Sequence, residues 1–201
     1  PSSWKDNCLM PIPLGVLAVA GAGGGGGLAN SYDLLATTIA SGSPTSITFS
    51  NINTYSEYKH LQIRWTCRFD TTSTARGLDL RMNGDGGGNY SGHYLQGEGP
   101  SGISSTSFIN QSKIRLGEAP GTNVTNLFAN GYIDILDFSL TTKNKTTRQF
   151  YGIAEPSNPY WRVGLYSGVW RNTAAITSLS FQADNGVAFI NGSRFSLYGI
   201  K

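Results

Sequence analysis

Strict alternation of apolar and polar side chains between residues 60 and 70 constrains the fold of this 201-residue chain more than any other feature. The apolar positions stand two residues apart: Leu61, Ile63, Trp65, Cys67 and Phe69. A two-residue period places these side chains on one face of a β-strand, whereas a helix would scatter them around its axis. The pattern predicts a half-buried antiparallel strand with one face on a core.

Similar runs recur along the chain, separated by clusters of Gly, Pro, Asn, Asp and Ser that are typical of turns. No window of twelve residues has a helical stripe. The further predicted strands are Ser31–Ala40, Ser46–Ser50, Leu78–Met82, His93–Gly97, Thr106–Leu116, Leu127–Phe138, Lys145–Ile153, Arg162–Arg171, Ala175–Ala183 and Arg194–Ile200. Short strands at this spacing predict an all-β fold, an antiparallel two-sheet sandwich with jelly-roll topology.

The N-terminal 30 residues have a different composition. Residues 9–20 are almost purely apolar and residues 21–27 read GAGGGGG. About a dozen apolar residues interrupted by prolines are too few for a helix that spans a bilayer. With Lys5 before it and Ala18-Val19-Ala20 at its end, the stretch resembles a secretory signal. We expect instead a division into an extended arm, residues 1–30, and a sandwich domain, residues 31–201.

The arm is expected to anchor the protein on a partner chain. Its apolar side chains would fill slots on that partner, and its glycines would allow the two backbones to approach closely. The residues expected to make this contact are Leu14, Val16, Leu17, Val19, Gly23 and Gly25. The alternative is that the segment folds back on its own domain.

Charge and cysteine content argue against several classes of function. Fifteen Lys and Arg against twelve Asp and Glu give a formal charge of +3, and the basic residues are scattered. This distribution gives no support to nucleic-acid binding. Cys8 and Cys67 are far apart, so neither a disulfide framework nor a zinc site is expected. We expect no metal and no cofactor.

Histidines and carboxylates offer little for catalysis. His60 and His93 are the only histidines, and each reads as a polar residue at a strand end rather than as a base. The chain has no Gly-x-Ser-x-Gly sequence. Asp134 and Asp137 are three apart, which places them on opposite sides of a strand. We expect no catalytic residue and no enzymatic activity.

Two further polar groups have structural interpretations. Asp70 and Asp79 are expected on the solvated outer faces of two different strands, although the sequence leaves a cross-strand pair of carboxylates open. The loop from Asn83 to Asn89 carries oxygen ligands and glycines, but it lacks the spaced Asp series and the closing Glu of an EF-hand. A wide hairpin connection is favoured over a calcium site.

Aromatic residues exceed what one sandwich core needs. Exposed rings near turns could stack on sugar rings. Packing in the core, or against another subunit, where aromatic side chains are enriched, explains the same residues at least as well. The candidates are Tyr90, Tyr94, Tyr160, Trp161 and Trp170. The segment Tyr132–Phe138 has apolar residues on both faces, which indicates a strand covered on both sides.

Several strings in order resemble a known family. They are Tyr58-Lys59-His60-Leu61-Gln62-Ile63-Arg64, Leu80-Arg81-Met82-Asn83-Gly84-Asp85, Asn89-Tyr90-Ser91, Ile133-Asp134-Ile135-Leu136-Asp137-Phe138 and Phe195-Ser196-Leu197-Tyr198-Gly199-Ile200-Lys201. Together they are similar to small structural proteins of tailed bacteriophages, described as tail-fibre-like or virion proteins. The resemblance spans roughly Ser31 to Lys201. It departs at the start, where Pro1 to Leu9 precede Met10-Pro11, the point at which a family member would begin.

The resemblance implies a non-enzymatic β-domain on a virus particle, fixed by its N-terminal arm to tail, neck or capsid proteins. We expect a fibre or appendage component of the virion, a homotrimer, with outer loops that face a host-surface glycan. One alternative is a capsid decoration or cement protein, which would occur in far more copies per particle than a fibre. Another is a carbohydrate-binding lectin, with a depolymerase less favoured.

Overall fold

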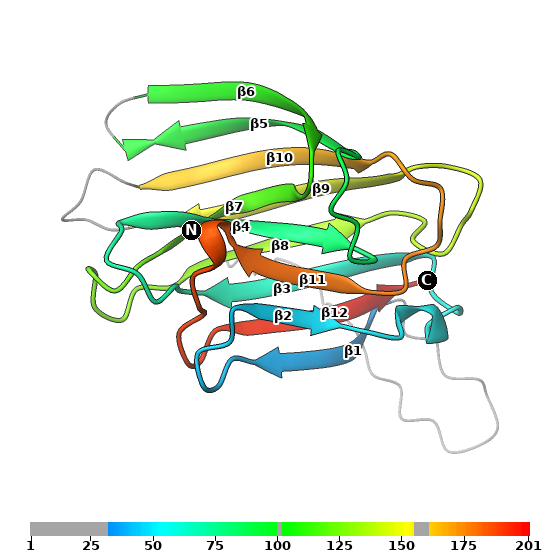
Figure 1. The fold of residues 1–201 in the computed structure, drawn as a ribbon, viewed down its shortest axis with the longest axis horizontal. Helices are drawn as coiled ribbons and strands as arrows, with labels where there is room; N and C mark the ends of the chain where they lie inside the picture. The colour runs from blue at the N-terminus through cyan, green and yellow to red at the C-terminus, as the bar shows by residue number, and fades with distance from the viewer. Residues whose placement is uncertain (1–31, 100–101, 155–160) are drawn as a thin grey trace, which may run out of the picture.

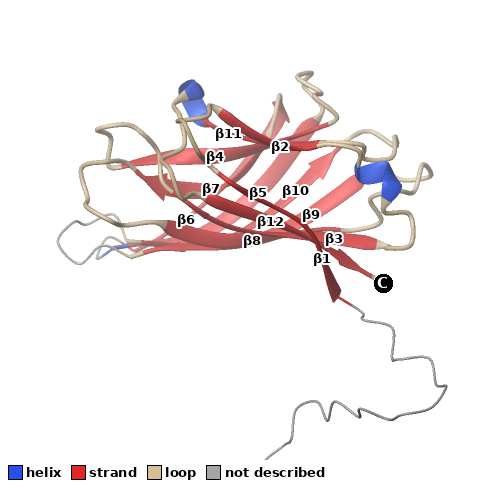
Figure 2. Ribbon diagram, turned by 90° about the horizontal axis from the view of Figure 1, so that it is seen from below, coloured by secondary structure: helices blue, strands red, loops and turns tan. Residues whose placement is uncertain are grey.

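The computed structural model describes residues 32–99, 102–154 and 161–201, which form two antiparallel β-sheets packed face to face (Figures 1 and 2). The larger sheet has eight strands in the order β1-β12-β3-β8-β9-β10-β5-β6, and the smaller has the order β2-β11-β4-β7. The predicted two-sheet sandwich is confirmed. The strands are β1 (Tyr32–Ile39), β2 (Ser46–Phe49), β3 (His60–Cys67), β4 (Ala75–Met82), β5 (Tyr90–Glu98), β6 (Gly102–Gln111), β7 (Ile114–Pro120), β8 (Ala129–Ile135), β9 (Lys145–Ile153), β10 (Arg162–Trp170), β11 (Leu179–Ala183) and β12 (Arg194–Ile200).

Eight of these strands have the jelly-roll arrangement. The strands β1-β12-β3-β8 face β2-β11-β4-β7, and successive jelly-roll strands alternate between the sheets except for β4 and β7, which pair with each other in the smaller sheet. The remaining four strands are two inserted hairpins, β5–β6 between β4 and β7, and β9–β10 between β8 and β11. Both hairpins extend the same edge of the larger sheet, where β10 pairs with β5.

Aromatic side chains from both sheets meet in the core. Phe181 of β11 packs on Phe195 of β12 with ring centroids 4.9 Å apart, and Phe189 packs edge-on against Phe195 at 5.4 Å. All three side chains are fully buried. Burial of one such side chain contributes about 1.5–3 kcal/mol. The alternating residues of β3 also point inward as predicted, and the Cys67 thiol is buried among them.

The smaller sheet does not cover the whole of the larger one. Its edge strand β7 lies over β8, β9 and β10 and also contacts β5, whereas β6 and much of β5 project beyond it (Figure 1). The inserted hairpin β5–β6 and the adjoining part of β10 therefore form an overhang. The face of this overhang that points toward β7 is called the inner face below, and the opposite face of the larger sheet is called the outer face.

A β-bulge shapes β7 at the base of the overhang. The register of β4 with β7 shifts between Leu78 and Asp79, so that Leu116 of β7 has no partner of its own. The next residue, Gly117, has a φ of +141°, and a Cβ atom there would lie 2.5 Å from the Tyr151 ring. Only glycine fits both the bulge and the ring beneath it.

One predicted strand and one predicted face are wrong. The segment Thr106–Leu116 is two strands, because the chain turns after β6 and crosses from the larger sheet to the smaller one. Asp79 was expected on a solvated face, yet only 1% of it is exposed, since Lys113 and Arg115 cover it. The predicted arm, residues 1–30, lies outside the described residues. Among the described residues, no helix is long and apolar enough to cross a membrane.

Candidate functional site

A cleft of about 450 Å³ lies where the overhang extends past the edge of β7. We call it the inner cleft. Its walls come from β5, β6 and β10 of the larger sheet and from β4 and β7 of the smaller one. Volumes of roughly 300–1,000 Å³ are typical of sites for small molecules. The side chains that line it include Tyr94, Gln96, Glu98, Phe108, Lys113, Arg115, Glu118, Arg162 and Tyr166.

Strand alternation directs polar side chains into the inner cleft. On β5 the inner positions are Tyr94, Gln96 and Glu98, while Leu95 between them points to the outer face. On β10 the inner positions include Arg162 and Tyr166. The register pairs Tyr94 with Tyr166 across the two strands, and their rings stack with centroids 4.8 Å apart. Tyr94 is half-buried, whereas Tyr166 is buried.

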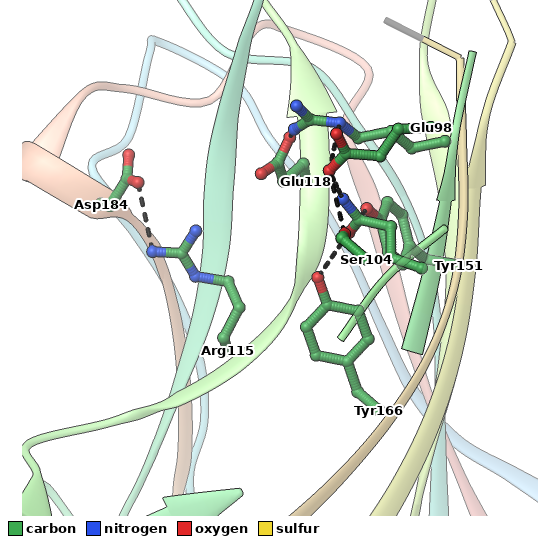
Figure 3. Close-up of polar contacts among 9 residues, drawn as sticks. Glu98, Ser104, Arg115, Glu118, Tyr151, Tyr166 and Asp184 are labelled. Atoms are coloured by element: carbon green, nitrogen blue, oxygen red, sulfur yellow. Dashed lines mark hydrogen bonds and ion pairs between the residues drawn. The ribbon is translucent and has the colours of Figure 1, made fainter. Parts of the chain in front are cut away.

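Gln96 is the centre of a hydrogen-bond network beneath the cleft. Its partners Glu98, Tyr151 and Tyr166 are labelled in Figure 3. Its side-chain oxygen accepts hydrogen bonds from the hydroxyls of Tyr151 at 2.6 Å and Tyr166 at 2.8 Å. Its amide nitrogen donates to Glu98, which also accepts from the Ser104 hydroxyl at 3.4 Å. Because Gln96 is 3% exposed, these bonds fix the inner wall of the cleft from behind.

Ion pairs hold the charged side chains of the cleft. Arg162 pairs with Glu118 of β7, and its Nε atom lies 3.7 Å from Glu98 of β5. This arginine therefore links the overhang to the smaller sheet. Such arginine–carboxylate pairs fix the orientation of both partners.

On the β7 side, Asp79 receives two cations. Its carboxylate lies 2.6 Å from the Lys113 amine and 2.7 Å from the Arg115 guanidinium. Arg115 also contacts Asp184 at 3.2 Å. The Asp79 and Asp184 charges help to hold the pKa of Arg115 above its ordinary value, against the opposing effect of burial, which is the largest.

Burial changes the acidity of the network tyrosines. It raises the pKa of Tyr166 to about 12, and it raises the pKa of Tyr151 as well. Both hydroxyls therefore stay protonated at neutral pH and act as hydrogen-bond donors to Gln96. The cleft offers fixed donors and acceptors, three cations and carboxylates that pair with them, and the ring surfaces of Tyr94 and Phe108.

The outer face of the same strands, in contrast to the polar inner cleft, exposes apolar side chains. One register row crosses four strands: Tyr132 of β8 stands opposite Phe150 of β9, then Leu165 of β10 and Leu95 of β5 follow. These side chains are 39%, 37%, 56% and 48% exposed in that order. We call these four residues the outer row. Val163 and Ile103 add exposed apolar surface beside it.

The predicted aromatic residues have separate locations. Tyr94 lines the inner cleft, and Trp161 is 47% exposed in a shallow hollow beside Val163. The interpretation of Tyr90 and Trp170 as exposed residues is wrong, because both are buried and stack on each other in the core. Tyr160 lies outside the described residues, as do Leu14, Val16, Leu17, Val19, Gly23 and Gly25.

Neither histidine lines the inner cleft. His60 Nδ1 accepts a hydrogen bond from the backbone of Asp137 at 3.0 Å, and the Asp137 carboxylate lies 3.6 Å away. His93 lies on the outer face of β5 opposite Ser167. Asp134, also on the outer face, pairs with Arg148 at 2.9 Å, whereas Asp137 follows the end of β8.

The loop from Asn83 to Asn89 is held in place by hydrogen bonds to its own carboxylate, that of Asp85. Asp85 accepts hydrogen bonds from Trp170 at 2.6 Å, from Asn89 at 2.9 Å and from the Gly87 amide at 2.8 Å. The Trp170 bond is the largest of the contributions that lower the pKa of Asp85. The loop is thus fastened to the end of β10. Within the described residues, no group of three or more His, Cys, Asp or Glu side chains is placed to hold a metal ion.

Of the side chains that line the cleft, only Tyr94 was singled out from the sequence as a candidate binding residue; Gln96, Arg162 and Phe108 are among those that were not. The available signal was inverted alternation in residues 94–98, where the polar positions Tyr94, Gln96 and Glu98 share a face and Leu95 lies on the other. The sequence alone does not say which of these faces is buried.

Comparison of the chain with protein-family models, with curated proteins and with solved structures gave no match.

Proposed function

We propose that the protein is a non-catalytic structural component of a bacteriophage particle, a fibre or appendage protein that works by binding other subunits. The sequence strings given above support the phage origin. The outer row supports the binding role, because contiguous exposed apolar surface on a soluble domain marks an interaction site. Exposed apolar residues scattered singly would carry no such weight.

The partner that we propose for the outer row is a second copy of this chain. The row itself is uncharged. Beside it, Asp134 and Arg148 form an ion pair, and Arg64, which stands opposite Tyr132 on β3, lies over the rings of Tyr32 and Tyr198. Two copies related by symmetry can therefore bring their rows together without opposing like charges. Tyr and Phe in the row are residue types enriched at the centres of subunit interfaces.

A charge placed in the outer row tests self-association. Leu165→Asp would bury a carboxylate against apolar side chains, so we expect at least about a tenfold weaker association constant, equivalent to about 1.4 kcal/mol. Sedimentation equilibrium of the full chain measures it, and the mass of the complex gives the number of subunits, three in the expectation from sequence.

Leu140→Asp is the matched control, since Leu140 is a 44% exposed leucine in the connection between β8 and β9, outside the row. A monomeric wild-type chain, or equal effects of both substitutions, would contradict the proposal that the outer row is an interface.

The arm is tested separately. We propose that residues 9–28 dock on another virion protein, and removal of residues 1–28 leaves β1 intact because that strand begins at Tyr32. We expect the shortened chain to fold and to self-associate but not to join the particle. Incorporation equal to that of the full chain would refute the anchor. Copy number per particle distinguishes an appendage, with few copies, from a cement protein, with hundreds.

A further inference from the structure

We propose that the inner cleft is a binding site for a neutral saccharide. The site is independent of self-association, because the inner cleft and the outer row lie on opposite faces of the same strands. Nothing in the outer row reaches the cleft, since successive residues of β5 and β10 alternate between the faces.

The balance of charge in the cleft favours a neutral ligand. Arg162 is matched by Glu118 and Glu98, and Asp79 is matched by Lys113 and Arg115. An anionic or a cationic ligand would meet charges of its own sign beside each partner. Hydroxyl groups both donate and accept, so they can bond to carboxylates and to guanidinium or ammonium groups in the same site.

Ring surfaces supply the apolar part of the site. Tyr94 and Phe108 border the cleft, and Tyr94 is supported from behind by its stacking on the buried Tyr166. The apolar face of a sugar ring packs on such aromatic surface, while its hydroxyls point to the polar side chains around it.

The cleft is preorganised, which favours binding of a small flexible ligand. Gln96 fixes Tyr166 and Glu98, and Arg162 bridges the two sheets across the cleft. A ligand therefore does not have to order these side chains when it binds, which reduces the entropic cost of association.

Titration of the full chain with neutral oligosaccharides of glucose, galactose, mannose and N-acetylglucosamine tests the site, with calorimetry or protein NMR as the readout. We expect at least one of them to bind, and Tyr94→Ala to weaken that binding about tenfold or more. Tyr94→Phe keeps the ring and should restore most of the affinity. Circular dichroism checks that each variant is folded.

Tyr132→Ala is the matched control, because it removes another half-exposed tyrosine from the opposite face of the same sheet. We expect it to bind saccharide like the wild type and to weaken self-association. Failure of every saccharide to bind, equal effects of Tyr94→Ala and Tyr132→Ala, or tighter binding of a hexuronate than of the matching neutral sugar would overturn the proposal. None of these results affects the self-association test of Leu165→Asp.

Discussion

The inner and outer faces of β5 and β10 reverse the usual order of an amphipathic strand. On β3, apolar side chains point into the core and polar ones point outward. On β5, by contrast, the buried Gln96 points inward while the 48% exposed Leu95 points outward. On β10, Tyr166 and Arg162 face the cleft while Leu165 and Val163 face solvent.

This difference shows that the buried face of a strand is apolar in the jelly-roll part of the larger sheet and polar in the inserted part. The jelly-roll strands bury apolar surface because they lie between two sheets. The inserted strands lie partly beyond β7, so their inner face needs polar groups that can satisfy one another. Such a network adds little net stability, but removing one of its members leaves buried polar groups without partners, which is costly. Exposed apolar surface on the other face adds no stability to an isolated subunit. Both features are better explained by binding than by folding.

The largest expected effect comes from breaking the inner network. Gln96→Leu leaves the buried hydroxyls of Tyr151 and Tyr166 without their acceptor, so we expect the free energy of unfolding to fall by about 2–5 kcal/mol. The reverse substitution on the next residue, Leu95→Gln, should change it by less than about 0.5 kcal/mol. Urea denaturation of dilute, monomeric protein measures both. Similar losses from the two substitutions would show that the faces do not differ as described.

Two neighbouring glycines sharpen the same comparison. At Gly164 of β10 a Cβ atom would lie 2.4 Å from the Tyr151 ring and 2.8 Å from the Tyr166 ring. Because both rings are buried and hydrogen-bonded, we expect Gly164→Ala to lower the free energy of unfolding by about 1–3 kcal/mol.

At Gly152 of β9, on the outer face, a Cβ atom meets nothing within 4 Å. We expect Gly152→Ala to raise the free energy of unfolding by about 0.5–1 kcal/mol, since alanine loses less backbone entropy on folding. Denaturation midpoints of the two variants in the same buffer give the result. A neutral Gly164→Ala would mean that the tyrosine rings can move aside.

The last expected effect is a dependence of the free energy of unfolding on alkaline pH. The pKa of Tyr166 is raised to about 12 in the folded protein, above the ordinary value of 10.0. The folded state therefore holds this proton more tightly, and the resulting stability is present below pH 10 and is lost as pH rises toward 12.

Between pH 9 and pH 11 the wild type should lose about 1 kcal/mol more than Tyr166→Phe, which has no hydroxyl to titrate. The free energy of unfolding at several pH values measures this difference. Parallel pH profiles of the two proteins would contradict the buried, hydrogen-bonded state of Tyr166.

Much of the sandwich could be predicted from periodicity, and much of the cleft could not. The run Leu61 to Phe69 predicted both a strand and its buried face, because apolar residues at a two-residue spacing all lie on one face of a β-strand. The strand Thr106–Leu116 was predicted as continuous because nothing in that segment marks the crossing between sheets. Asp79 was placed on a solvated face because its cover, Arg115, comes from a strand 36 residues further along the chain.

The sequence also did not distinguish buried from exposed aromatic residues. Tyr90, Tyr94 and Trp170 looked alike in sequence, each near a turn. Tyr90 and Trp170 stack on each other in the core, and Asp85 accepts a hydrogen bond from the Trp170 indole. Tyr94 lies further along β5 and lines the inner cleft. The position of β7 determines which of these aromatic side chains are buried in the core and which one lines the cleft.

The sequence by itself determined that this chain forms antiparallel strands and which residues share a face of each strand, because alternation is a local property of the backbone. In the inserted strands β5 and β10, the tertiary structure decided which of the two faces is buried, since that depends on how far the smaller sheet reaches across the larger one. The smaller sheet ends at β7 and leaves β6 and much of β5 beyond its edge, and there the polar face lines the inner cleft and the apolar face is an external surface. The two proposed binding sites follow from that one edge.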